Sequence, residues 1–166
     1  MDWSLLGFRG LGQVFNIHPV FVHFPIALFP TALLFYAIGV LGRKDRFLFA
    51  AQISLGLAFL SVIVTVITGL LALESFPHNE TIHNMMMTHQ KVGYTILVFG
   101  GILFVWSFFK KEEAPKLPKL FLALLAFTVL MVLQNGDLGG RMVFVEGAAV
   151  RNATPLMEEN HHHHHH

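Results

Sequence analysis

The feature that most constrains this chain is a set of four long apolar segments separated by short polar ones. Residues 20–41, 47–73 and 92–109 each form a nearly uninterrupted apolar run. An α-helix needs roughly 20 apolar residues to cross a bilayer core of about 30 Å, so these runs are close to that length or exceed it. A fourth run, 120–133, is shorter and approaches that length only when its neighbours are included. Because a backbone inside lipid must satisfy its own hydrogen bonds, the sequence predicts an all-α, four-helix integral membrane bundle.

The predicted bundle accounts for nearly the whole chain. Hydrophobic residues make up 54% of the sequence and charged residues 13%, more apolar material than one soluble core of this size buries. We predict a single transmembrane domain over residues 1–155, with spans at about 18–42, 46–74, 89–110 and 117–135. Residues 156–166 form a predicted disordered tail that ends in a hexahistidine tag, which is set aside.

Positive charge is concentrated in the two short connections between paired spans. The segment 42–46 carries three basic residues, and the segment 110–119 carries four lysines. Lysine and arginine are enriched in cytoplasmic loops, so we expect these connections on the cytoplasmic side of the membrane. An even number of spans then places both termini, and the loop 74–90, on the extracytoplasmic side.

Composition excludes several classes of function. The chain has no cysteine, which rules out disulfides, cysteine-ligated iron–sulfur clusters and covalent attachment of haem through C-x-x-C-H. A formal net charge of +1 without a long basic run gives no reason to expect nucleic acid as a partner. No nucleophile–base pair, phosphate loop or carboxylate pair has usable spacing within the spans. We therefore expect an electron-transfer protein or a subunit rather than a stand-alone enzyme.

Two histidines lie near the starts of separate predicted spans. An imidazole about one turn inside the apolar region, as at His23, is costly to bury without a partner, a metal or a water-filled pocket. His23 and His89 are each followed four residues later by a small residue, Ala27 or Gly93, which leaves a flat macrocycle room on the same helix face. We predict that His23 and His89 are the axial ligands of a haem b, with His18 as the substitute.

Other parts of this haem hypothesis concern the surroundings of the ring. Arg9 or Arg141 would meet the propionates at the outer surface.

The alternative to a haem site is that the histidines are interfacial residues satisfied by water or by freed backbone carbonyls. Pro25 frees one such carbonyl, that of Phe21, because proline has no N–H to donate to it.

The segment before the third span offers a competing metal site. It combines imidazoles and thioethers, which suit copper or zinc, although a methionine run beside a membrane helix is more often packing material. The alternative metal ligands are His78, His83, Met85, Met86 and Met87, with His89 beside them.

A third hypothesis is a non-catalytic subunit of a larger membrane complex. The second span carries a stripe of small residues at intervals of three or four, which lets another helix approach closely. Its members are Ser54, Ala58, Ser61, Thr65, Gly69 and Ala72.

The region after the fourth span is rich in turn-forming residues. Glycine, asparagine and aspartate in 134–141 predict a turn, followed by an extended segment, 142–146, that folds back over the outer face.

Two motifs connect the chain to a known family. The pattern HPxxVHFPxAL at residues 18–28 and the pattern GGxxVFxxGxxV at residues 139–150 resemble those of the bacterial membrane-protein family named domain of unknown function 2231. His89 is similar to the histidine that starts the third span in that family. The chain departs from the family pattern at Glu146, where many members have histidine, and at Arg141, where an acidic residue is common.

The resemblance implies a four-helix membrane domain that in other proteins occurs beside Rieske or c-type cytochrome domains. It therefore suggests electron transfer outside the cytoplasm. The partners expected on this basis are the lipid bilayer, a quinol or other membrane partner, an extracytoplasmic redox protein, and further copies of the chain or a larger complex.

Overall fold

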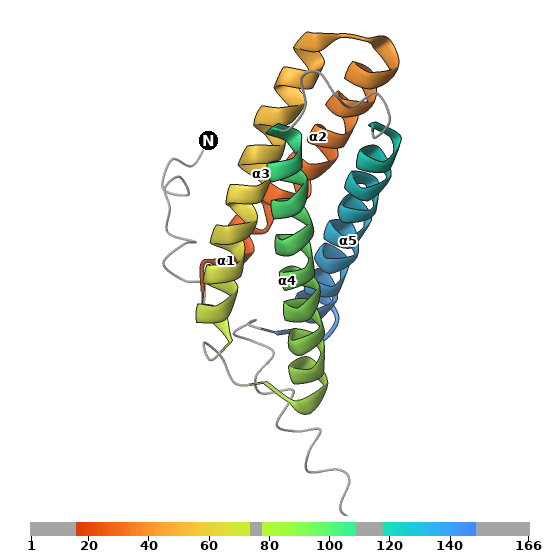
Figure 1. Ribbon diagram of the computed structural model, residues 1–166. Coiled ribbons are helices and arrows are strands. Elements are labelled where there is room, and N and C mark those ends of the chain that lie inside the picture. Colours follow the sequence, from red (N-terminus) through yellow and green to blue (C-terminus); the bar gives the residue numbers. More distant parts are fainter. Residues whose placement is uncertain (1–15, 74–77, 109–117, 149–166) are drawn as a thin grey trace, which may run out of the picture.

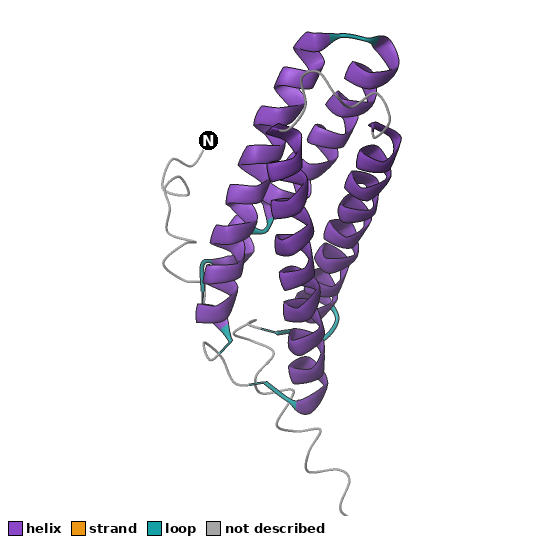
Figure 2. Cartoon of the chain, in the orientation of Figure 1, coloured by secondary structure: helices purple, strands orange, loops and turns teal. Residues whose placement is uncertain are grey.

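The computed structural model describes residues 16–73, 78–108 and 118–148, and the regular elements in these ranges are all helices (Figures 1 and 2). The helices are α1 (His18–Phe21), α2 (His23–Gly42), α3 (Asp45–Ala72), α4 (Glu80–Phe108) and α5 (Pro118–Phe144). The four long helices run alternately in opposite directions, and α2 and α4 each contact both α3 and α5. The predicted all-α four-helix bundle is confirmed.

The outer surface of the bundle is apolar on every side. Four helical segments in the described part of the chain are long and apolar enough to cross a membrane: His18–Gly42, Asp45–Ala72, Glu80–Phe108 and Lys119–Phe144. Each long helix also exposes large apolar side chains, and Leu34, Leu57, Val98 and Leu130 are 56%, 50%, 58% and 65% exposed. Such a belt is stable in contact with lipid and costly in water, so the protein is a membrane protein.

The third span begins earlier than predicted. Helix α4 starts at Glu80, so most of the predicted loop 74–90 is helical instead. The side chain of Asn79 caps this helix, because its Oδ1 accepts the backbone N–H of Ile82 at 2.8 Å. Glu80 adds a negative charge to the first turn, where the helix dipole favours it. As a result His89 lies about two and a half turns inside α4.

The fourth span ends later than predicted. Residues 134–141 continue α5, as do residues 142–144, so the predicted turn and extended segment are wrong. The glycines serve close contact instead: a Cβ added at Gly136 would lie 3.1 Å from Ile26 Cδ1. The chain leaves the helix after Phe144, and Gly147 has a φ of 69°. Ala148 then donates its N–H to Met142 O at 2.8 Å and packs in a small buried cluster with Ile82 and Met86 of α4.

The start of the first span is irregular, as the prolines predict. A break at Val22 separates α1 from α2, and Pro25 leaves the Phe21 carbonyl without its helical donor. Thr65 on α3 donates its hydroxyl to that carbonyl at 3.3 Å, and it also bonds Ser61 O at 2.8 Å. This contact fixes the position of α1 against α3.

The densest packing lies away from α1. Phe29, Leu55, Leu103 and Leu125, one from each long helix, are at most 1% exposed and belong to one cluster. The cluster extends toward the basic end of the bundle, defined here by the turn at 42–46 and the start of α5. The opposite end, defined by α1, the start of α4 and residues 135–148, is called the histidine end.

Candidate functional site

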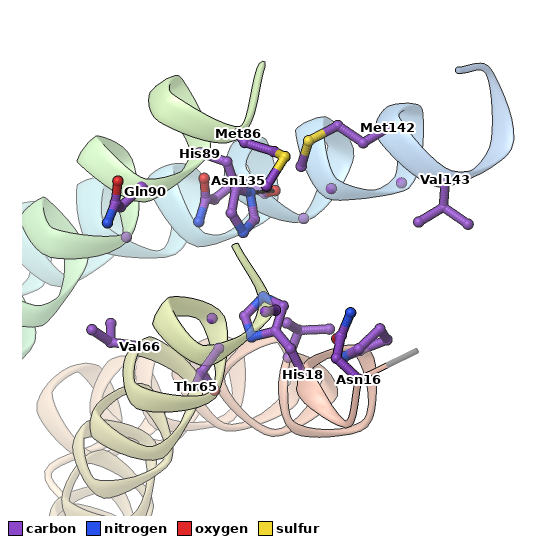
Figure 3. A pocket seen from close by; sticks show the side chains of 18 of the residues that line it. Asn16, His18, Thr65, Val66, Met86, His89, Gln90, Asn135, Met142 and Val143 are labelled. Atoms are coloured by element: carbon purple, nitrogen blue, oxygen red, sulfur yellow. Dashed lines mark hydrogen bonds between the residues drawn. The ribbon is translucent and has the colours of Figure 1, made fainter. Parts of the chain in front are cut away.

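A cavity of about 430 Å³ lies at the histidine end of the bundle (Figure 3). One wall is formed by α1, α2 and α3, and the other by α4 and α5. Most lining side chains are aliphatic or absent, with glycine at 69, 93, 136, 139 and 140. The cavity is therefore an apolar slot between the wall of α1, α2 and α3 and the wall of α4 and α5.

His18 and His89 face each other across this slot. His18 is the first residue of α1, and His89 lies within α4. Their ring centres are 6.0 Å apart and their planes are inclined at 89°. Figure 3 shows the two rings reaching into the slot from opposite walls. The structure thus brings together the predicted ligand His89 and the predicted substitute, His18.

Helix α5 holds the His89 ring in place. His89 Nδ1 lies 3.1 Å from the backbone oxygen of Asn135, and because a carbonyl only accepts, Nδ1 carries the hydrogen and donates it. A Cβ added at Gly139, one turn further along α5, would lie 3.4 Å from the ring carbon Cε1. The glycine therefore lets the imidazole lie close to the α5 backbone.

Helix α3 holds the His18 ring in a similar way. His18 Nδ1 lies 3.3 Å from the hydroxyl oxygen of Thr68. That hydroxyl already directs its single hydrogen to the carbonyls of Val64 and Thr65, each at 3.0 Å, so its oxygen accepts from His18 Nδ1. A Cβ added at Gly69 would lie 3.0 Å from His18 Cε1, closer than ordinary packing permits.

Both imidazoles use the same ring nitrogen to contact the neighbouring helix. His18 Nδ1 contacts Thr68 and His89 Nδ1 contacts the Asn135 carbonyl, which leaves Nε2 with a lone pair in the neutral ring. Histidines that bind metals usually donate their other N–H to an oxygen in this manner. Two imidazoles that share one metal ion, with bonds of about 2 Å and each nitrogen roughly 1 Å from its ring centre, would have their centres at most roughly 6 Å apart. The 6.0 Å between the ring centres of His18 and His89 is compatible with this limit.

His23, the other predicted axial ligand, lies at the edge of the same cavity. It is the first residue of α2, its side chain is exposed, and it is one of the lining residues. The ring that contacts His89 belongs to His18. A ligand role for His23 stays a prediction.

Of the other residues predicted to surround the haem, some line the cavity and others do not. Gly93 lines the cavity and lies near Asn135, whereas Ala27 is exposed and does not line it. Arg141 is also exposed and outside the cavity lining. Arg9 lies outside the described residues.

The alternative metal ligands do not gather in one place. His78 and His83 contact each other, with Nε2 and Nδ1 3.3 Å apart. Met86 is buried and lines the cavity, while Met85 and Met87 are only partly buried and do not line it. Within the ranges that the structure describes, no group of three or more histidine, cysteine, aspartate or glutamate residues is placed to hold a metal ion.

Comparison with known proteins gives one match. The family model described as predicted membrane protein (DUF2231) matches residues 14–152. The chain belongs to the DUF2231 family. The match includes all five helices of this DUF2231 protein and both walls of the cavity. No curated protein and no solved structure matches the chain.

Sequence reasoning missed the residues of this DUF2231 protein that position the rings. Gly69 belongs to the small-residue stripe, which suggested only helix packing, and Thr68 lies beside it. Asn135 was assigned to a turn, but it is in α5. Its side-chain Oδ1 is buried without a hydrogen-bond partner among the described residues, and it lines an adjoining cavity of about 60 Å³ with His89. A polar amide inside an apolar run was the available signal.

Proposed function

We propose that this protein binds one haem b between His18 and His89 and transfers electrons at the extracytoplasmic face of a bacterial inner membrane. The observation that carries the proposal is the pair of imidazoles on opposite walls, with ring centres 6.0 Å apart and each Nδ1 bonded to an oxygen. Axial ligation by histidines from facing helices is how bundles hold this cofactor.

The form of the cavity supports a flat ligand. The slot separates α1–α3 from α4–α5, and each of its walls includes glycine where a larger side chain would fill the space. Its lining is predominantly apolar, as a porphyrin face requires. The Oδ1 of Asn135, which is buried without a partner among the described residues, lies beside the same space and would accept a hydrogen bond from a bound water.

Thr68 and Asn135 act by orienting the two imidazoles. Thr68 and the Asn135 carbonyl hold the imidazoles with Nε2 free to ligate, so little rearrangement accompanies binding. When bound, haem supplies one-electron redox chemistry. His18 and His89 would hold the haem iron from both sides, which supports electron transfer rather than substrate turnover.

The charge distribution supports the proposed orientation. Arg43, Lys44 and Arg46 are exposed at the basic end, opposite the cavity. By the positive-inside rule this end is cytoplasmic, which places the histidine end outside. The electron partners proposed for that position are a membrane quinol and an extracytoplasmic redox protein.

A copper ion is the second candidate for the same cavity. Met86 and Met142 both line it, and Figure 3 shows their sulfur atoms on the side of the His89 ring. Met142 also packs against the small buried cluster that contains Met86. Thioethers and imidazoles together suit Cu(I). Elemental analysis separates this candidate from haem.

Titration with haemin tests the proposed function. Protein purified in detergent, with the tag residues 161–166 removed, is expected to develop a Soret band that saturates at about one haem per chain. A reduced-minus-oxidised spectrum is expected to show the sharp bands of a b-type cytochrome. Absence of a Soret band after haemin addition would contradict the proposal, and stoichiometric copper in its place would support the second candidate.

A further inference from the structure

A second pair of imidazoles lies outside the cavity, at the start of α4. His78 precedes the helix and His83 lies in its second turn. His78 Nε2 and His83 Nδ1 are 3.3 Å apart, the ring centres are 5.5 Å apart, and the planes differ by only 4°. This pair does not line the cavity, so it is independent of the proposed haem site.

The distances show how the two rings are placed. Each nitrogen lies roughly 1 Å from the centre of its ring, so a 3.3 Å gap between nitrogens and a 5.5 Å gap between centres require the nitrogens to face each other. Two ligands on a tetrahedral ion, with bonds of about 2.0–2.1 Å, are separated by roughly 3.3–3.4 Å. The two nitrogens therefore have the spacing of two ligands of one metal ion, and small rotations of both rings would turn the lone pairs from each other toward that ion.

The backbone between the two histidines is held in place by the helix cap. Asn79 Oδ1 accepts the Ile82 N–H at 2.8 Å, and the Asn79 carbonyl accepts the His83 N–H at 3.0 Å. These bonds fix the turn that brings His78 and His83 together. A chelating segment that is already ordered loses less conformational entropy when the metal ion binds.

We propose that His78 Nε2 and His83 Nδ1 chelate a divalent transition-metal ion of the Zn²⁺, Ni²⁺ and Cu²⁺ class. Both rings bind in the neutral form, and the ring that holds a hydrogen at the shared position moves it to its other nitrogen. Within the ranges that the structure describes, no third histidine or acidic side chain joins the pair, so the proposed site has two protein ligands, His78 and His83.

Isothermal titration of haem-loaded, tag-free protein with zinc chloride tests this proposal. We expect about one Zn²⁺ per chain, with the affinity lowered at least roughly tenfold in His78→Ala and in His83→Ala. The matched control is His23→Ala, which removes another exposed imidazole and is expected to leave zinc binding unchanged. Zinc is also expected to raise the unfolding temperature of the wild type but not that of His83→Ala.

Two results would overturn the proposal. One is the absence of zinc binding, or binding that survives both substitutions. The other is zinc binding that is lost in His18→Ala or His89→Ala but kept in His78→Ala, which would place the ion in the cavity. The haem spectrum is recorded on the same samples, so failure of the haem proposal and failure of the zinc proposal are distinguishable.

Discussion

His89→Ala and His18→Ala are each expected to abolish stable haem binding, whereas His23→Ala is expected to keep it. Each of the first two substitutions removes one of the imidazoles that face each other 6.0 Å apart, while His23 lies at the exposed edge of the cavity. Loss of the hydrogen-bonding partners of a metal ligand commonly costs 10–100-fold in affinity, so loss of the ligand itself is expected to cost at least roughly 100-fold. Haemin titration followed at the Soret band measures the change.

Controls for these variants are available in the same experiment. Helical content by circular dichroism and elution on size exclusion establish that each variant is folded. Free imidazole, which fits the space that the side chain leaves, is expected to restore part of the Soret band in both variants. Full binding by His18→Ala together with loss in His23→Ala would instead favour the pair His23 and His89 that the sequence predicted.

Gly69→Ala is expected to weaken haem binding by roughly tenfold or more. The added Cβ would lie 3.0 Å from His18 Cε1 and would push the ring from its position beside Thr68. Crowding of this kind typically costs about 1–3 kcal/mol, and about 1.4 kcal/mol corresponds to tenfold in affinity. The dissociation constant for haemin, measured at the Soret band, reports the effect.

Gly42→Ala is the matched control for this substitution. Gly42 lies at the basic end, outside the cavity lining, and the nearest atom to a Cβ added there is Lys44 Cγ at 3.6 Å, which is ordinary contact. This variant is expected to bind haem like the wild type. Equal weakening of haem binding in both variants would contradict the role of Gly69 in positioning His18 against α3.

The number and nature of the helices could be predicted from the sequence because a bilayer imposes one strong requirement. Every backbone hydrogen bond must be made within a span, so long apolar runs such as 20–41 and 47–73 have one available structure. Helix ends were predicted less well. Asn79 and Glu80 are favourable at a helix start, yet the histidines and methionines after them suggested a loop.

The pairing of the histidines could not be predicted from spacing alone. Which of His18 and His23 enters the bundle depends on how α1 lies against α3. One contact between them joins the Thr65 hydroxyl to the carbonyl that Pro25 frees. Such a contact joins residues far apart in the chain, and a helical period drawn through residues 18–28 does not reveal it.

The glycines at 136, 139 and 140 were also misread for a physical reason. Glycine favours turns in water because its backbone is unrestrained. Inside a membrane bundle the same lack of a side chain lets neighbouring groups approach closely, as Ile26 does at Gly136 and His89 does at Gly139. Only the last glycine of the motif, Gly147, has the left-handed conformation that a turn requires.

Electron paramagnetic resonance of the oxidised, tag-free protein tests most directly whether His18 and His89 hold one haem. Haem iron held by two imidazoles would give a low-spin ferric signal, and the rings of His18 and His89 are the pair that face each other across the cavity. We predict that signal in the wild type and its loss in His18→Ala and His89→Ala. A high-spin ferric signal from haem-loaded wild-type protein, or a signal that persists unchanged in either variant, would contradict this account.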